Sequence, residues 1–234
     1  MDGELKVYDD KGELLDEAVT EHPSDYIKSL LIKYKSPRFE DFPTFTGGLV
    51  GYFAYDYIKY SEKKLKLDAR DEEGFKDVDL MLFDRVICFD NLKQKIIVIA
   101  NASTTDFEAS YEKAKKDIDE IISLILNGKP AAIEKGKMLS SYRKLFEKDE
   151  FCDMVDQAKE HIFEGDIFQV VLSNRLVADF QGSLFDTYRV LRTINPSPYM
   201  FYFSGDDIEV AGASPETLVK CEPASSFALT GSCP

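Results

Sequence analysis

The sequence predicts an α+β fold in which antiparallel sheets are flanked by helices. Apolar runs of strand length occur in adjacent groups, and segments with apolar residues at helical spacing lie between these groups. Strands that alternate singly with helices would instead favour a parallel sheet. The chain has 234 residues, of which 44% are hydrophobic and 12% aromatic, so it can bury a substantial core.

The first elements predicted are a helix and a group of strands. Ser24 is a candidate N-cap for a helix over residues 25–34, and Ser36-Pro37 would end this helix. Residues 45–57, FTGGLVGYFAYDY, are rich in glycine and aromatic side chains. This composition is typical of strands with a close backbone approach.

A hairpin and a long helix are expected next. The apolar runs 80–89 and 95–100 flank a short polar stretch, which predicts a hairpin. Apolar residues then recur at helical spacing from Phe107 to Ile125. Residues 129–147 contain glycine, proline and many charges, so they are predicted to form a linker or a surface loop.

Two parts of the chain are therefore expected, residues 1–128 and residues 148–222. The second part begins with a helix over 149–164 that ends at Gly165. Residues 223–234 form an atypical tail of small and polar residues. The further elements predicted are a strand at 167–172, a helix at 183–194, and strands near 199–203, 208–211 and 217–220.

Composition excludes several classes of function. With 29 basic and 43 acidic residues, the net charge is −14, which repels phosphate backbones and excludes nucleic acid as a partner. No apolar run approaches the roughly 20 residues of a membrane span, and no secretory signal opens the chain, so we expect a cytoplasmic protein without membrane contact. The cysteines lack paired spacing and are expected to be reduced thiols: Cys88, Cys152, Cys221 and Cys233.

Polar residues stand at both ends of an apolar strand in GDIFQVVLSNR, residues 165–175. In the structural interpretation, which the pattern alone favours, Gln169 bonds to a neighbouring backbone and Arg175 is exposed. In the functional interpretation, the Gln169 amide orients a small polar reactant. An amide cannot accept a proton near pH 7, whereas a lysine with a lowered pKa can.

Two further motifs have both a structural and a functional interpretation. NPSPYMF, residues 195–201, is either a rigid turn before a strand or a pocket for an aromatic ligand walled by Tyr199 and Met200. In GASPE, Glu216 is either a helix cap or surface residue, or a general acid in a cleft. GGLVGY, residues 47–52, lacks a following Gly-Lys-Ser/Thr, so we reject nucleotide binding and expect glycines that let another sheet approach.

Taken together, four stretches resemble one family. FTGGLVGYFAYDYIKY, GDIFQVVLSNR, NPSPYMFYF and GASPETLVK occur in this order and resemble anthranilate synthase component I, a chorismate-utilising enzyme of tryptophan biosynthesis. The resemblance covers roughly residues 42–220 and implies a sandwich of antiparallel sheets flanked by helices. It also implies a lyase reaction in which chorismate and ammonia give anthranilate and pyruvate. A partner amidotransferase subunit would deliver the ammonia from glutamine, and Mg²⁺ would act as a Lewis acid.

The resemblance implies roles for individual residues. Gln169 would position ammonia, where relatives that add water to chorismate carry a lysine. Glu216 would be the general acid for the departing hydroxyl. The residues that match the family's pocket for tryptophan, a feedback inhibitor, are Asn195, Pro196, Pro198, Tyr199 and Met200.

The same resemblance implies that this chain is an internal fragment. The family carries an upstream LLES-like segment that completes the tryptophan pocket. Downstream it carries a PIAGTRPRG-like stretch, a catalytic histidine and the glutamates that hold Mg²⁺. Residues 148–222 would then be the start of the chorismate-binding domain, without metal ligands of its own, and the chain alone is expected to be inactive. The alternatives are aminodeoxychorismate synthase component I, of the para-aminobenzoate branch, and a non-catalytic remnant that binds a ligand or a subunit.

Overall fold

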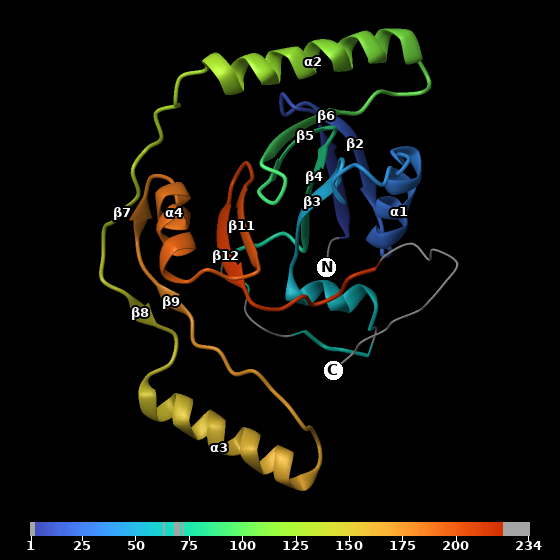
Figure 1. Cartoon of the computed structure of the whole chain (residues 1–234). Coiled ribbons are helices and arrows are strands. Elements are labelled where there is room, and N and C mark those ends of the chain that lie inside the picture. Colours follow the sequence, from blue (N-terminus) through green and yellow to red (C-terminus); the bar gives the residue numbers. More distant parts are fainter. Residues whose placement is uncertain (1–2, 63, 68–70, 72, 222–234) are drawn as a thin grey trace. The chain divides into compact units, whose positions relative to one another are not determined.

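The computed structural model describes residues 3–62, 64–67, 71 and 73–221 (Figure 1). The chain divides into two compact units, Met1–Pro130 and Ala131–Pro234. Within the described residues, every named sheet consists of two antiparallel strands. None of the described helices is long and apolar enough to cross a membrane.

The first unit opens with a hairpin and a helix. Strand β1 (Glu4–Tyr8) pairs with β2 (Leu14–Val19), and helix α1 (Pro23–Lys33) follows. The prediction of Ser24 as the N-cap is wrong, because the N-cap is His22 and Pro23 occupies the first turn. Proline suits this position, since its fixed φ matches the helix and its missing N–H would have no partner there.

Two strand pairs come next, and the chain changes from one pair to the other at a single residue. Strand β3 (Gly48–Phe53) pairs with β4 (Val78–Phe83), while β5 (Arg85–Asp90) and β6 (Lys95–Ala100) form the predicted hairpin. The run 80–89, predicted as one strand, is therefore divided at Asp84. A 3₁₀ helix, η1 (Tyr55–Tyr60), follows β3.

Asn101 stabilises the junction between the β3–β4 pair and the β5–β6 pair. Its backbone N–H donates to the carbonyl of Asp84 over 2.8 Å, and its Nδ2 donates to the same carbonyl over 3.0 Å. The same Nδ2 also donates to the carbonyl of Thr46 over 2.7 Å, just before β3. One side chain therefore ties the beginning of β3 to the break between β4 and β5.

Gly51 lies where the backbones of β3 and β4 come close together. A Cβ atom placed on Gly51 would overlap the carbonyl oxygen of Asp79, which leaves no room for a side chain. The expectation of glycines that permit close approach is confirmed at this position. The approaching backbone, however, is the neighbouring strand of the same pair and not another sheet.

Helix α2 (Phe107–Asn127) lies against β6, as Figure 1 shows. The predicted helical spacing is confirmed, and the helix ends at Gly128 as its C-cap. Among the described residues, only Ile99 of β6 and Ala114 of α2 are buried hydrophobics, with 8% and 7% of their surface exposed. The described core of this unit is therefore centred on the contact between α2 and β6.

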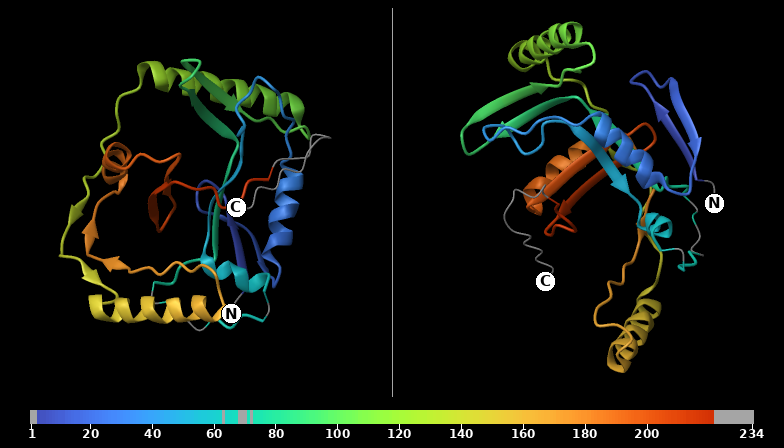
Figure 2. Two further views of the ribbon diagram at one scale, coloured as in Figure 1. Left: turned by 60° about the horizontal axis from the view of Figure 1, so that its bottom comes forward. Right: turned by 90° about the vertical axis from the view of Figure 1, so that its right-hand side faces the viewer.

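The second unit contains helices α3 (Lys148–Glu164) and α4 (Phe185–Ile194) and the hairpin of β11 (Tyr199–Ser204) with β12 (Glu209–Ser214). Helix α4 packs against this hairpin, as the two views of Figure 2 show. Within the predicted loop 129–147 lie two short strands, β7 (Lys137–Met138) and β8 (Arg143–Lys144). They pair with β10 (Phe180–Gln181) and β9 (Leu176–Val177).

Both ends of α3 carry specific caps. At its beginning, Glu147 and Glu150 form a capping box, in which each side chain accepts a hydrogen bond from the backbone N–H of the other residue. At its end, Gly165 adopts a φ of 82°, and Asp166 N–H donates to the carbonyl of His161 over 3.0 Å. This is a Schellman motif, which glycine favours because it has no Cβ. The predicted end of this helix at Gly165 is confirmed.

Two predicted strands are absent from the structure. Residues 167–172 and residues 217–220 form no strand, and within the described part of the chain neither segment makes a backbone hydrogen bond to a partner strand. The physical reason is that a strand needs a second strand to pair its backbone groups. The apolar pattern showed a strand-forming segment but could not show whether this chain supplies its partner.

Candidate functional site

The β11–β12 hairpin brings two separate motifs to the same end. In its register Tyr199 lies opposite Ser214 and Met200 lies opposite Ala213. Because the strands are antiparallel, Pro198 enters β11 at the end where the chain leaves β12 towards Glu216. The segment predicted to bind tryptophan and the predicted general acid are therefore neighbours.

The backbone of Glu216 is held by a side chain of β12. Ser214 Oγ donates to the carbonyl of Glu216 over 2.9 Å, and Glu216 N–H approaches the same Oγ at 3.4 Å. The Glu216 residue itself is exposed. The described residues therefore fix where Glu216 leaves the hairpin but do not enclose its side chain in a cleft.

The NPSPYM segment begins where α4 ends. Asn195 is the C-cap of α4, and its N–H donates to the carbonyl of Leu191 over 2.9 Å. Tyr199 is 50% exposed, Pro196 and Pro198 are exposed, and Met200 is half-buried. The two prolines thus restrict the backbone where this segment enters β11. The described residues do not close a pocket around the segment.

An open groove of about 530 Å³ runs along α4 beside β12. It does not include the segment predicted to bind tryptophan. The residues that line it are Leu184, Asp186, Thr187, Val190, Leu191, Ile194 and Ala211.

Glu209 joins α4 to the hairpin, a role that no pattern in the sequence indicated. Its Oε1 accepts hydrogen bonds from Tyr202 Oη over 2.6 Å and from Ser183 Oγ over 3.0 Å. Its Oε2 accepts from the N–H of Leu184 over 2.6 Å, at the beginning of α4. These bonds, first that from Tyr202 and then that from Leu184, lower the pKa of Glu209. A carboxylate at a helix N-terminus is also favoured by the helix dipole.

Replacing Glu209 with glutamine is expected to lower the free energy of unfolding of the second unit by roughly 2 kcal/mol, because hydrogen bonds to a charged acceptor are weakened. The loss should depend on pH. A lowered pKa in the folded state stabilises the fold above the ordinary pKa of 4.5, and this stabilisation is lost as the pH falls through the folded-state value. Urea unfolding at pH 7 and below pH 4 measures both effects. Asp206→Asn, at an exposed position in the turn of the same hairpin, is the matched control; an equal loss in the control would contradict the role of Glu209.

Gln169 and Arg175 lie in the extended segment that follows α3, and both are exposed. Asn174 anchors the end of this segment: its Oδ1 accepts from Phe146 N–H over 3.1 Å and its Nδ2 donates to the carbonyl of Phe146 over 2.8 Å. The backbone carbonyl of Arg175 accepts from Leu145 N–H over 2.8 Å. Within the described residues, no hydrogen bond or ion pair joins Gln169 to Glu216.

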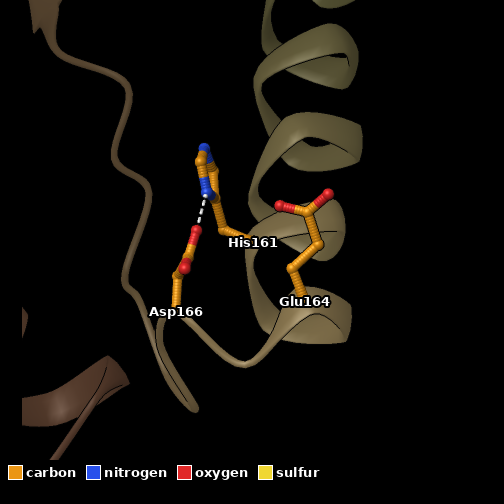
Figure 3. Close-up of side chains that lie close together, drawn as sticks. All are labelled: His161, Glu164 and Asp166. Carbon is orange, nitrogen blue, oxygen red and sulfur yellow. Dashed lines mark hydrogen bonds and ion pairs between the residues drawn. The ribbon is translucent and has the colours of Figure 1, made fainter.

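Three side chains with possible metal ligands lie together at the end of α3 (Figure 3). His161 Nδ1 lies 2.8 Å from Asp166 Oδ2, and ligand atoms of His161, Glu164 and Asp166 are all within 4.8 Å of one another. All three residues are exposed. Mg²⁺ prefers octahedral oxygen ligands, whereas imidazole suits softer divalent metals. This group, the one such cluster in the described part of the chain, therefore does not fit the Mg²⁺ that the resemblance implies.

The chain as a whole is similar to known proteins. A family model described as chorismate binding enzyme matches residues 5–231. Anthranilate synthase component 1 of Acinetobacter calcoaceticus is 36% identical over an alignment of 231 residues, and the match covers 94% of this chain and 46% of that protein. The protein of the same name from Aquifex aeolicus is 40% identical over 211 residues, 87% of this chain and 42% of that protein.

A solved structure gives the same result at the level of the fold. Anthranilate synthase component I from Streptococcus pneumoniae superposes with a TM-score of 0.68 at 28% identity and covers 92% of this chain and 49% of that one. This likeness confirms the predicted fold class. The chain spans a little under half the length of the curated relatives described above. The family model matches nearly the whole chain, and the chain therefore belongs to the family of chorismate binding enzymes.

Proposed function

We propose that this chain is part of an anthranilate synthase component I that acts on chorismate in tryptophan biosynthesis. The observation that carries the proposal is the family match over residues 5–231. The relatives from Acinetobacter calcoaceticus and Aquifex aeolicus share the name anthranilate synthase component 1, which favours this branch over aminodeoxychorismate synthase. The order of the four motifs along the chain supports the same assignment.

In the proposed reaction, chorismate and ammonia give anthranilate, pyruvate and water. A partner amidotransferase subunit releases the ammonia from glutamine. The ammonia nitrogen forms a bond to the ring as the 4-hydroxyl leaves as water, and the enolpyruvyl group is then eliminated as pyruvate. Glu216 protonates the departing hydroxyl, and Gln169 orients the ammonia. Ammonia needs positioning and not deprotonation, so an amide suffices at this position.

The proposal also assigns a regulator and a metal. Tryptophan binds at the segment from Asn195 to Met200, next to the point where Glu216 leaves β12. The ligands of the Mg²⁺ ion lie in the part of the family's fold beyond Lys220, since the cluster at the end of α3 does not fit this ion.

Anthranilate formation tests the proposal. The chain is fused to the portion of the Aquifex aeolicus relative that follows the matched region, and it is supplied with chorismate, Mg²⁺ and ammonium. Fluorescent anthranilate is expected from the fusion and not from the chain alone. Para-aminobenzoate in place of anthranilate, after an aminodeoxychorismate lyase is added, would assign the other branch. If the fusion is folded and binds tryptophan but forms no product, the role of a non-catalytic binding protein is favoured.

Replacing Gln169 with lysine in this fusion is expected to shift the products from amination towards hydration of chorismate, because a lysine with a lowered pKa can activate water. The ratio of anthranilate to hydroxylated product, separated by chromatography at fixed ammonium concentration, measures the shift. Gln169→Met is the matched control, since it removes the amide without adding a base. An unchanged ratio in the lysine variant would remove Gln169 from the site.

A further inference from the structure

The three side chains that meet at the end of α3 have no part in the proposed reaction. His161 and Asp166 face one another, with 2.8 Å between Nδ1 and Oδ2, and Glu164 lies on the last turn of the helix (Figure 3). Ligand atoms of all three residues lie within 4.8 Å of one another. An imidazole beside two carboxylates is a donor set that binds divalent metals.

The local sequence brings these side chains together. His161 and Glu164 are three residues apart in a helix, so they share one face. Gly165 then reverses the chain with its φ of 82°, and the N–H of Asp166 donates to the carbonyl of His161 over 3.0 Å. The Schellman motif therefore positions the backbone of all three residues before a ligand binds, which lowers the entropy lost on binding.

We propose that His161, Glu164 and Asp166 bind a divalent transition metal, with Zn²⁺ as the expected ion. The metal takes the place of the proton that joins His161 Nδ1 to Asp166 Oδ2. Glu164 supplies the third ligand, and water completes the coordination, because all three residues are exposed. Three protein ligands and one open position form a recognised type of zinc site.

The distances suit an ion of this size. A tetrahedral zinc ion lies about 2.0–2.1 Å from its nitrogen and oxygen ligands, which places the ligand atoms about 3.3 Å apart. One separation in the group is 2.8 Å and the others are no more than 4.8 Å, so shifts of about 1.5 Å or less are required. The side chains of His161 and Asp166 are 60% and 59% exposed, so they can rotate without disturbing packed neighbours.

The charge around the group attracts cations. Residues 148–166 hold seven acidic residues and two lysines, and one of these, Lys159, pairs with Asp156 over 2.8 Å. The C-terminal end of a helix also carries the negative end of the helix dipole. Such a field attracts every cation, but imidazole favours Zn²⁺, whereas Mg²⁺ prefers oxygen ligands. The site is therefore expected to select Zn²⁺ over Mg²⁺.

The chain has only two histidines, which makes a residue-specific test possible. The full chain, prepared without a histidine tag and with reduced cysteines, is titrated with Zn²⁺ while the imidazole resonances are followed by NMR. The resonances of His161 are expected to shift, and those of His22, the exposed N-cap of α1, are not. His22→Gln assigns the two sets. The proposal is overturned if both histidines respond alike or if neither responds.

Substitutions show whether the carboxylates are ligands. Glu164→Gln and Asp166→Asn are each expected to weaken Zn²⁺ binding at least tenfold, as read from the His161 resonances, since loss of a group that only supports a ligand already costs roughly 10–100-fold. Glu160→Gln is the matched control, because it removes an exposed carboxylate from the same helix and leaves the three ligands in place. Parent affinity in both ligand variants, or an equal loss in the control, would contradict the proposal.

Competition with Mg²⁺ tests the selectivity. A large excess of Mg²⁺ is expected to leave Zn²⁺ bound at His161. Displacement would reveal an acidic surface that holds an adventitious ion only, and the proposal would fall. The inference goes beyond the proposed function, and none of its measurements requires turnover, so either can fail without the other.

Discussion

Replacing Glu216 with glutamine is expected to lower the rate of anthranilate formation by about 10²–10⁴-fold, the usual contribution of a general acid. Glutamine keeps the shape of the side chain, but its amide N–H is too weak an acid to transfer a proton to the departing hydroxyl. Substrate binding should change little, so the effect should appear in kcat and not in KM. Steady-state kinetics of the fused enzyme with ammonium as the nitrogen source measure both constants.

A control separates chemistry from folding. Asp206→Asn removes a carboxylate from the turn at the opposite end of the same hairpin and should leave kcat unchanged. Ser214 holds the backbone of Glu216 in both variants, so the position of residue 216 is preserved. If Glu216→Gln turned over as fast as the parent enzyme, Glu216 would have no part in the mechanism.

Replacing Gly51 with alanine is expected to lower the free energy of unfolding of the first unit by about 3 kcal/mol, at the upper end of what overpacking costs. The new methyl group would meet the backbone carbonyl of Asp79, and a backbone cannot move aside as the end of a flexible side chain can. Strands β3 and β4 would have to separate, with loss of ladder hydrogen bonds. Urea unfolding followed by circular dichroism measures the change, since the chain has no tryptophan for a fluorescence signal.

Gly12→Ala is the matched control for this prediction. Gly12 has a φ of +81° and no atom within 4 Å of the added Cβ. Alanine there should therefore cost only the left-handed conformation, about 1 kcal/mol. Equal losses at the two positions would show that backbone conformation, and not the lack of space beside Asp79, accounts for the effect at Gly51.

Elements with strong local signals could be predicted from the sequence. The spacing of apolar residues indicated α2, and the glycine at position 165 indicated the end of α3, because both signals act within a few residues. The cap of α1 was mistaken because Ser24 and Pro23 compete for the same turn. The break at Asp84 was missed because both halves of the run are apolar, and only Asn101, from farther along the chain, marks the division.

The candidate site could be predicted only in part. Four motifs in a fixed order indicated the family, but no local pattern contains the register that places Tyr199 opposite Ser214. Glu209 was missed because a single glutamate at the beginning of a strand does not indicate its partners, which lie as far away as Ser183. The prediction of a strand at residues 167–172 was wrong for the same reason. Strand pairing depends on two segments, whereas an apolar pattern describes a single segment.

The pairing of Tyr199 with Ser214 has a consequence for how this chain can evolve. The two residues are partners across one strand pair, a separation of about 5 Å. Under the proposed function, a change that repacks Tyr199 also displaces the strand end from which Glu216 emerges. Substitutions of Tyr199 that abolish inhibition by tryptophan should therefore also lower the catalytic rate. Escape without that penalty is expected at positions outside the ladder, such as Pro196.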